Sequence, residues 1–463
     1  MIALALAGAL LGGGCDGALC NGHALAPVFA KLARQGVGVG GRPVHILQIG
    51  DSHTAGDAIT NGWRTILQAR YGYGGRGVLP PGRPYDGYTT HGVTVSMSPG
   101  WKIAADFGSA WSSPSPPLGL SAFSLTSQSD GASMSLIADP SEMFDRLTVC
   151  AIAQPGAGRL ALSAGTENVT FNLSSPTPRP ECRTVKLAQP TSAATVAASD
   201  GPVTVTSWGT FRDSGGVVVS NLGVVGSQLL HFQRTDDAVL AEELNAYRPD
   251  LIVVAFGTNE GFGPHFSKFE YEIILRTEIG RLRRLAGNVP ILLLGAPDAL
   301  SRRAEMRNNA DSGPSEPCGP TPAQLPAPAT AASTPPAAPA TQSPQGVIAS
   351  IMDHLRDSLG MAPDAAAAPP PVVVATPTPP STRGPLFPPP ALKAVREVQR
   401  SVASSLNVAF WDWEARMGGR CTADAWFHSN PPLMRSDYVH YTSAGGAEIA
   451  KRLQADLDRA AAK

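Results

Sequence analysis

The chain has 463 residues, with 36 lysines and arginines against 37 aspartates and glutamates, so its formal net charge is −1. This balance does not indicate a polyelectrolyte partner, so we do not expect duplex binding by a basic face. Hydrophobic residues make up 43% of the chain, enough for a sizeable core, and no run of 18 apolar residues predicts a membrane-spanning helix.

The chain opens with an apolar segment of small residues. Residues 1–14 read MIALALAGALLGGG and precede Cys15. The pattern resembles the apolar part of a secretory signal, so we interpret residues 1–24 as a signal-like segment and expect export. Cys15 could carry a lipid anchor, although Gly12 stands where a leucine is usual, and plain cleavage nearby is the alternative.

The chain contains six cysteines, an even number that is compatible with disulfides in an oxidising compartment. Cys150 and Cys182 flank one strand-like stretch and form a candidate pair. No CxxC pair or compact His/Cys cluster is present, so we expect no structural zinc site.

Five apolar runs have the Val/Ile/Leu character of strands buried on both faces of a parallel sheet: 44–49, 217–222, 251–256, 291–295 and 407–411. Helix-like patterns alternate with them: 60–72, 228–244, 268–287, 391–406 and 443–460. The alternation predicts a doubly wound α/β domain with a five-stranded parallel sheet, assembled from residues 41–78, 215–300 and 391–463.

Two insertions interrupt this alternation. Residues 79–214 consist of short alternating segments separated by Gly, Pro, Ser and Asp, which predicts an inserted all-β sandwich. Residues 301–390 are rich in Pro and Ala, and 21 of the 43 prolines lie between 313 and 390. We expect this second insertion to be disordered, with one short helix at 346–360.

Polar residues follow the first three predicted strands. The first runs into Gly50-Asp51-Ser52-His53, the second into Gly223-Val224-Val225-Gly226-Ser227, and the third into Gly257-Thr258-Asn259-Glu260. Each loop alone is compatible with ordinary turns and helix caps. Together they would face one crevice, where Ser52 is a candidate nucleophile and where the Gly226 N–H and the Asn259 amide are the donors that an oxyanion hole needs.

Near the carboxyl terminus, Asp437-Tyr438-Val439-His440 leads into the last predicted helix. A carboxylate three residues before a histidine can lie beside one imidazole nitrogen and leave the other to face a serine. His440 is therefore the candidate base and Asp437 its partner, whereas packing or surface roles are expected for the seven histidines other than His440 and His53.

These four blocks, in this order, resemble the SGNH (GDSL-like) hydrolases. The resemblance implies a flavodoxin-like SGNH hydrolase fold, Ser52 as nucleophile, His440 as general base and acid, and Asp437 as its orienting partner. The Ser52 N–H, Gly226 and Asn259 would bind the oxyanion, and no metal or other cofactor is implied. His53 replaces the commoner leucine after the serine, a variant seen in some carbohydrate-directed members.

The GDSH block, the inserted β domain and the expected export look more narrowly like the peptidoglycan O-acetylesterases of Gram-negative bacteria. The implied function is removal of O-acetyl groups from a cell-wall glycan, most directly peptidoglycan, in the periplasm or cell envelope. The Pro/Ala-rich insertion departs from that pattern, and the carbohydrate-binding role of the β insertion is implied by architecture alone.

Three other functions stay open at this point. The same triad could transfer acetyl to a polysaccharide, the chain could bind glycan without catalysis, or it could act on other esters as a lipase or thioesterase. Trp101, Trp111, Trp208 and Tyr88 are aromatic residues of the insertion that could stack on a sugar. The sequence gives no indication of oligomeric state.

Overall fold

The computed structural model describes residues 14–35, 40–303, 308–309, 313–319 and 384–463. Residues 1–13 of the signal-like segment lie outside the described residues, as does most of the Pro/Ala-rich insertion with its expected helix at 346–360. The described residues up to 319 and from 385 onward belong to one compact unit. Within these ranges no helix has the length and apolar character that crossing a membrane requires.

A seven-stranded sheet lies at the centre of the α/β part, in the order β1-β2-β20-β17-β16-β3-β15. Its strands are β1 (Cys15–Asp16), β2 (Leu19–Cys20), β3 (Val44–Gly50), β15 (Val217–Gly223), β16 (Leu251–Ala255), β17 (Ile291–Leu294) and β20 (Ala409–Trp411). From β20 to β15 each strand pairs in parallel with the next. The near-continuous Val/Ile/Leu runs fit these strands because both of their faces are buried.

The amino-terminal end of the described chain corrects two expectations. Residues 14–24 are part of the fold, because β2 pairs antiparallel with β20 and Leu19 is 1% exposed. They therefore add two strands to the expected five-stranded sheet, and a removable leader would have to end before them. Cys15, one possible lipid-anchor site, is joined to Cys20 in a disulfide, and in this bonded form its sulfur is not free to carry a lipid.

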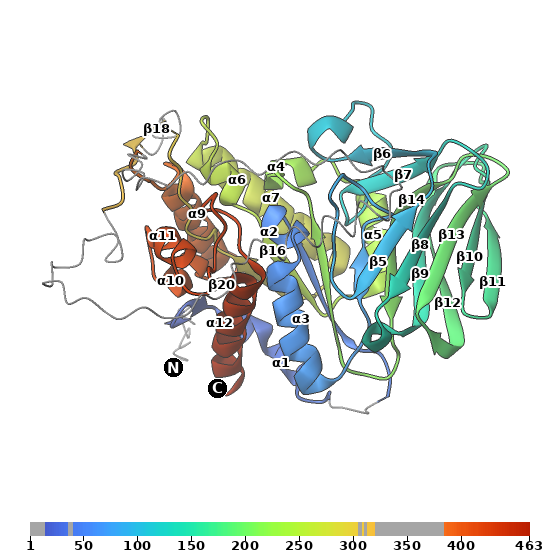
Figure 1. Ribbon diagram of the computed structural model, residues 1–463, viewed down its shortest axis with the longest axis horizontal. Helices are drawn as coiled ribbons and strands as arrows, with labels where there is room; N and C mark the ends of the chain where they lie inside the picture. The colour runs from blue at the N-terminus through green and yellow to red at the C-terminus, as the bar shows by residue number, and fades with distance from the viewer. Residues whose placement is uncertain (1–13, 36–39, 304–307, 310–312, 320–383) are drawn as a thin grey trace, which may run out of the picture. The chain divides into compact units, whose positions relative to one another are not determined.

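Helices cover both faces of the sheet (Figure 1). One hydrophobic core packs this sheet against α5 (Asp237–Tyr247), α7 (Lys268–Ala286) and α9 (Leu392–Ser405). A second core packs its other face against α1 (Ala26–Leu32), α3 (Ala58–Tyr71) and α12 (Ser443–Ala461). Alternate strand residues enter opposite cores, as β-strand geometry requires. In Figure 1, α3 (blue) and α12 (dark red) lie side by side, although in the sequence they are near opposite ends of the chain.

The first insertion forms two antiparallel sheets. One has the order β11-β10-β13-β8-β5; the other has the order β12-β9-β14-β7-β6, with β4 paired to β14. The strands are β4 (Gly77–Leu79), β5 (Val93–Met97), β6 (Trp101–Ala105), β7 (Phe123–Ser127), β8 (Ser133–Ala138), β9 (Phe144–Ala153), β10 (Arg159–Ala164), β11 (Glu167–Asn172), β12 (Arg179–Thr191), β13 (Ala193–Ser199) and β14 (Thr204–Phe211). Both sheets contribute side chains to one hydrophobic core, the arrangement expected of a sandwich.

Two disulfides outside the amino-terminal pair tie distant segments together. Cys150 on β9 is bonded to Cys182 on β12, the pair expected from the sequence. Cys318 is bonded to Cys421, which precedes α11 (Thr422–Phe427). The remaining short elements are β18 (Asn308–Asn309), β19 (Gly313–Pro314), α2 (Ser52–Ala55), α4 (Leu229–Phe232), α6 (Thr258–Gly261), α10 (Trp413–Met417), and the 3-10 turns η1 (Gly22–Leu25), η2 (Gly108–Ala110) and η3 (Pro140–Glu142).

The register of three neighbouring strands sets the position of the candidate site. Gly50, the last residue of β3, pairs with Gly223 of β15 on one side and with Ala255 of β16 on the other. The loops that follow these three strands therefore leave the sheet at the same edge. A side chain at Gly50 has no room, because its Cβ would lie 2.5 Å from the Ala255 carbonyl oxygen.

Candidate active site

Ser52 stands at the turn between β3 and α2. Asp51 is the N-cap of α2, where its Oδ1 accepts the backbone N–H of His53 at 2.9 Å. The Asp51 N–H donates to the Ala255 carbonyl at 3.3 Å, which ties the turn to β16. A capping aspartate directly after a crowded glycine thus fixes the backbone that presents Ser52.

His440 lies between Ser52 and Asp437. Its Nε2 is 2.9 Å from the Ser52 Oγ, and its Nδ1 is 2.8 Å from the Asp437 Oδ2. The other carboxylate oxygen, Oδ1, accepts the N–H groups of Val439 and His440, each at 2.9 Å. The structure therefore brings together the three residues that the sequence analysis singled out as a triad.

The charge of Asp437 is stabilised by these contacts. Burial alone would raise the pKa of this carboxyl, but the hydrogen bonds from the His440 ring and from the two backbone N–H groups hold the pKa below its ordinary value of 3.8. An ionised Asp437 accepts the Nδ1–H of His440 and leaves Nε2 unprotonated toward Ser52. This is the tautomer that a general base needs.

Gly226 and Asn259 lie on the two loops that flank Ser52. The Asn259 Nδ2 donates to the Ser227 carbonyl at 2.8 Å, and the Gln228 Nε2 donates to the Asn259 carbonyl at 3.1 Å. These two bonds join the loop after β15 to the loop after β16. Gly226 has φ +80°, a conformation that favours glycine.

Donors remain available at this edge of the sheet. Across the described ranges, no hydrogen bond within the chain uses the backbone N–H of Ser52 or of Gly226. The Asn259 amide uses one of its two N–H groups for Ser227. The three expected oxyanion donors thus lie on adjacent strand ends, each with an N–H group that a ligand can take.

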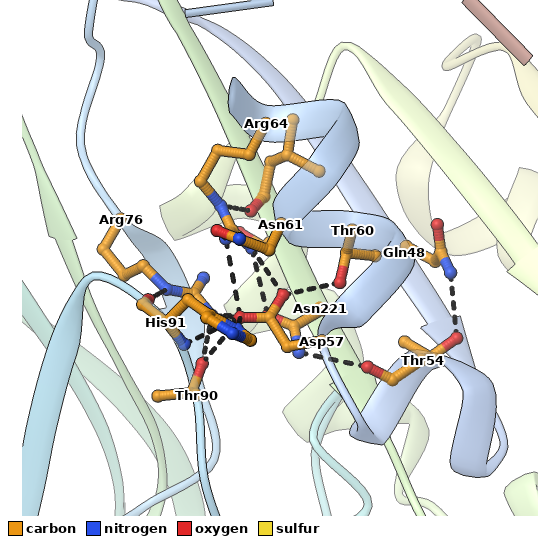
Figure 2. A network of polar contacts seen from close by, with 12 residues as sticks. Gln48, Thr54, Asp57, Thr60, Asn61, Arg64, Arg76, Thr90, His91 and Asn221 are labelled. Atoms are coloured by element: carbon orange, nitrogen blue, oxygen red, sulfur yellow. Dashed lines mark hydrogen bonds and ion pairs between the residues drawn. The ribbon is translucent and has the colours of Figure 1, made fainter. Parts of the chain in front are cut away.

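A buried charge network supports the turn from the side of the insertion (Figure 2). Asp57 accepts hydrogen bonds from Arg64 at 3.0 Å, from Arg76 at 3.1 Å and from the His91 backbone N–H at 2.9 Å. Asn221 accepts from both arginines and donates its Nδ2 to the Thr54 carbonyl of α2 at 3.1 Å. The network therefore connects the helix that carries Ser52 to α3, to β15 and to the loop before β5.

The insertion also contacts the loop that carries Gly226. The Phe107 ring stacks on His231 with ring centroids 4.4 Å apart, and a Cβ at Gly226 would lie 2.9 Å from this ring. The Ser227 hydroxyl donates to Asp106 at 3.4 Å. Burial raises the pKa of Asp106 to about 7, although this hydrogen bond and Arg234 act in the opposite direction.

A cavity of about 810 Å³ opens beside this contact. It is lined by residues of the insertion and of the loop after β15, among them Tyr85, Phe107, Phe123, Val224 and Val225. Of the four aromatic residues that could stack on a sugar, Trp208 is 0% exposed and Tyr88 is 9% exposed, so neither has a free face. Trp101 and Trp111 keep partial exposure but do not line the cavity.

The contacts of His53 were not expected from the sequence. This histidine is 5% exposed and contacts both Asp51 and the Val439 carbonyl. Its position next to Ser52 was the available signal, but its partner on the carboxyl-terminal loop is 386 residues away. Glu260, beside Asn259, is likewise buried, and burial raises its pKa to about 7.

The fold is similar to that of a solved structure described as "Peptidoglycan O-acetylesterase in action, 5 min". The two align with a TM-score of 0.67 and 22% sequence identity, over 96% of this chain and 99% of that chain. This similarity shows that the chain has the fold of that protein over nearly its whole length.

Two further solved structures align much less closely. An acetyl xylan esterase gives a TM-score of 0.27 with 13% identity over 52% of this chain and 81% of its own, and a family two carbohydrate esterase from Cellvibrio japonicus gives 0.16 with 15% identity over 44% and 79%. These scores are too low to define a shared fold. No family model and no curated protein matches the sequence.

Proposed function

We propose that this protein is a serine esterase of the SGNH type that removes O-acetyl groups from a cell-wall glycan, most directly peptidoglycan. The observation that carries the proposal is the continuous chain of contacts from Ser52 through His440 to Asp437, with spacings of 2.9 and 2.8 Å. A serine, an imidazole and a carboxylate in this order are the components of nucleophilic acyl transfer.

The reaction takes two steps. His440 Nε2 accepts the Ser52 proton while Oγ attacks the acetyl carbonyl, and the N–H groups of Ser52, Gly226 and Asn259 bind the oxyanion. As the tetrahedral intermediate collapses and its bond to the sugar oxygen breaks, His440 gives its proton to that oxygen, which leaves as the sugar hydroxyl. Water, activated by the same imidazole, attacks the acetyl-enzyme and releases acetate while Ser52 is restored.

Two observations support a glycan as the substrate. The cavity of about 810 Å³ lies between the insertion and the Gly226 loop, and Tyr85 and Phe107 are among the residues that line it. Aromatic side chains can pack on the apolar side of a sugar ring. The fold is that of a protein described as a peptidoglycan O-acetylesterase, which favours this polymer over other glycans.

An exported location in the periplasm or cell envelope follows from the same proposal. The substrate is found there, and all six cysteines form disulfides, which persist in oxidising compartments.

The test is acetate release from O-acetylated peptidoglycan by the purified protein, with a soluble aryl acetate assayed in parallel. We expect release from the polymer, and we expect Ser52→Ala and His440→Ala each to lose at least about 10³-fold in kcat. Hydrolysis of the aryl acetate but not of the polymer would support the catalytic triad and refute peptidoglycan as the substrate. Acetyl transfer to an added glycan, with no acetate released, would identify a transferase instead.

A further inference from the structure

His53 makes two hydrogen bonds that one neutral imidazole cannot make together. Its Nδ1 is 3.1 Å from the Asp51 Oδ1, and its Nε2 is 2.9 Å from the Val439 carbonyl oxygen. A carboxylate and a carbonyl are both acceptors, whereas a neutral imidazole carries only one N–H. Both contacts are satisfied only when both ring nitrogens are protonated.

The surroundings favour this charged form. The side chain of His53 is 3% exposed and that of Asp51 is 1% exposed, so the two charges face each other away from water. Burial lowers the pKa of the imidazole, but the charge and hydrogen bond of Asp51, the Val439 carbonyl and the more distant Asp437 together raise it above its ordinary value.

The other groups around the ring are not competing cations. Trp413 and Tyr441 pack edge-on at centroid distances of 5.5 and 5.7 Å, and the Thr258 hydroxyl lies 3.4 Å from Nδ1. Burial keeps the pKa of the Tyr441 phenol well above its ordinary value, so that group is neutral. His440 is the remaining ionisable neighbour, with its ring centroid 5.5 Å away.

The hydrogen bond from His53 to the Val439 carbonyl also restrains His440, the proposed general base. The Val439 carbonyl and the His440 N–H belong to the same peptide unit. Asp437 accepts the N–H on one side of this unit, and His53 donates to the carbonyl on the other. The peptide that precedes His440 is therefore held from both sides, which fixes the direction in which the imidazole leaves the backbone.

We propose that His53 is a positioning residue, held as an imidazolium between Asp51 and the Val439 carbonyl, that fixes His440 against Ser52. This inference rests on the proposed function for its catalytic consequence, but the protonation state of His53 can be measured without any substrate. It assigns to the residue after the nucleophile a role distinct from those of the triad.

The first test is nitrogen NMR of the histidine side chains in the intact wild-type protein at pH 7. We expect both ring nitrogens of His53 to carry protons. His45 is the internal control: it is equally buried, but it contacts the Tyr247 carbonyl at 3.0 Å and the Ser220 hydroxyl at 2.8 Å, a pair that a neutral ring satisfies. One unprotonated nitrogen on His53 would overturn the proposal, whether or not the protein hydrolyses esters.

The second test is catalytic. His53→Leu, which introduces a side chain of similar size without donors, is expected to lower kcat on the aryl acetate roughly 10- to 100-fold while KM changes little, because the loss lies in the orientation of His440. Wild-type kcat in a folded His53→Leu protein would refute the positioning role. Absence of hydrolysis by the wild type would refute the proposed function instead.

A double variant distinguishes the loss of the His53–Val439 contact from the effect of leaving the Asp51 charge without its partner. His53→Leu leaves Asp51 as an unpaired buried carboxylate, so Asp51→Asn is added to remove that charge. If positioning through Val439 is the role, the double variant stays as slow as His53→Leu. Recovery of kcat in the double variant would show that the unpaired charge, and not the lost contact, caused the defect, and would overturn the proposal.

Discussion

Asn259 has two functions in the proposed site, one for each of its side-chain N–H groups. One N–H donates to the Ser227 carbonyl at 2.8 Å and holds the loop that carries Gly226. The other is available to the oxyanion. The same side chain thus sets the spacing between two of the proposed donors and serves as one of them.

Asn259→Ala is expected to lower kcat for acetate release by about 10²–10³-fold with little change in KM, because an oxyanion donor acts mainly in the transition state. Steady-state kinetics on the aryl acetate measures both constants. Gln228→Ala is the matched control, since Gln228 ties the same two loops through the Asn259 carbonyl but offers nothing to the oxyanion. An equal loss in both variants would indicate loop disorder instead of a lost donor.

The residues of the candidate site could be proposed from two signals in the sequence, the ends of recognisable strands and the spacing of an acid and a histidine. Ser52, Gly226 and Asn259 come after apolar runs that had to end at one sheet edge, and Asp437 precedes His440 by three residues. His53 could not be assigned in this way. Its role depends on a backbone carbonyl 386 residues away, and no spacing pattern encodes a contact with a carbonyl.

At the scale of elements, Asp57 joins α3 to the segments packed around it. Its carboxylate is fully buried and faces two arginines, of which Arg76 is 0% exposed (Figure 2). Burial raises the pKa of Asp57, but the charges of Arg64 and Arg76 and the hydrogen bonds to the carboxylate outweigh it and hold the pKa well below 3.8. The carboxylate is thus the anion that keeps two buried cations together.

Asp57→Asn is expected to lower the free energy of unfolding by about 3–5 kcal/mol, because it leaves the buried guanidinium groups without their counter-charge. Asparagine tolerates the backbone conformation at this position, φ +51°, so strain adds little. Urea unfolding followed by circular dichroism measures the change. Thr60→Ala removes one neutral donor to the same carboxylate and should cost only about 1 kcal/mol.

The elements themselves were largely predictable, but their polar connections were not. The five apolar runs became β3, β15, β16, β17 and β20, since continuous burial leaves a strong signal. β1 and β2 were missed because each has two residues, too few for any periodicity. The burial of Arg64 and Arg76 could not be predicted either, because nothing in the sequence distinguishes a solvent-exposed arginine from one that is paired with Asp57.

At the scale of the whole molecule, the insertion takes part in the site that it interrupts. Asp106 lies directly after β6 and contacts the Ser227 hydroxyl, and its Oδ1 has no hydrogen-bond partner in the described part of the chain. A carboxyl whose folded pKa is raised binds its proton more tightly in the folded state than in the unfolded state. It therefore reduces stability as the pH rises from its unfolded value of 3.8 through about 7.

Asp106→Asn is expected to remove this dependence. The free energy of unfolding of the variant relative to wild type should rise by about 1–3 kcal/mol between pH 5 and pH 8, since the wild type must ionise a buried group over that range. Urea titrations at the two pH values give the difference directly. An identical offset at both would show that Asp106 does not titrate in this interval.

A substitution of Tyr85 tests whether glycan binds in the cavity between the insertion and the Gly226 loop. Tyr85→Ala should raise KM for O-acetylated glycan roughly 3- to 10-fold by removing one aromatic face, while leaving kcat/KM for the small aryl acetate unchanged. Phe171→Ala is the matched control, because Phe171 lies on β11 in the same insertion and does not line the cavity. Equal effects of the two substitutions would argue against glycan binding in this cavity.

The order of the chain has a consequence for when the enzyme becomes active. Ser52 and His440 are 388 residues apart, and the loop that carries His440 leads directly into α12, which packs against α3. A growing polypeptide therefore carries the proposed nucleophile from early in synthesis but positions the proposed base only after α12 has been made and has docked on α3. Until α12 docks, the proposed triad is incomplete, so we expect the nascent chain to lack esterase activity.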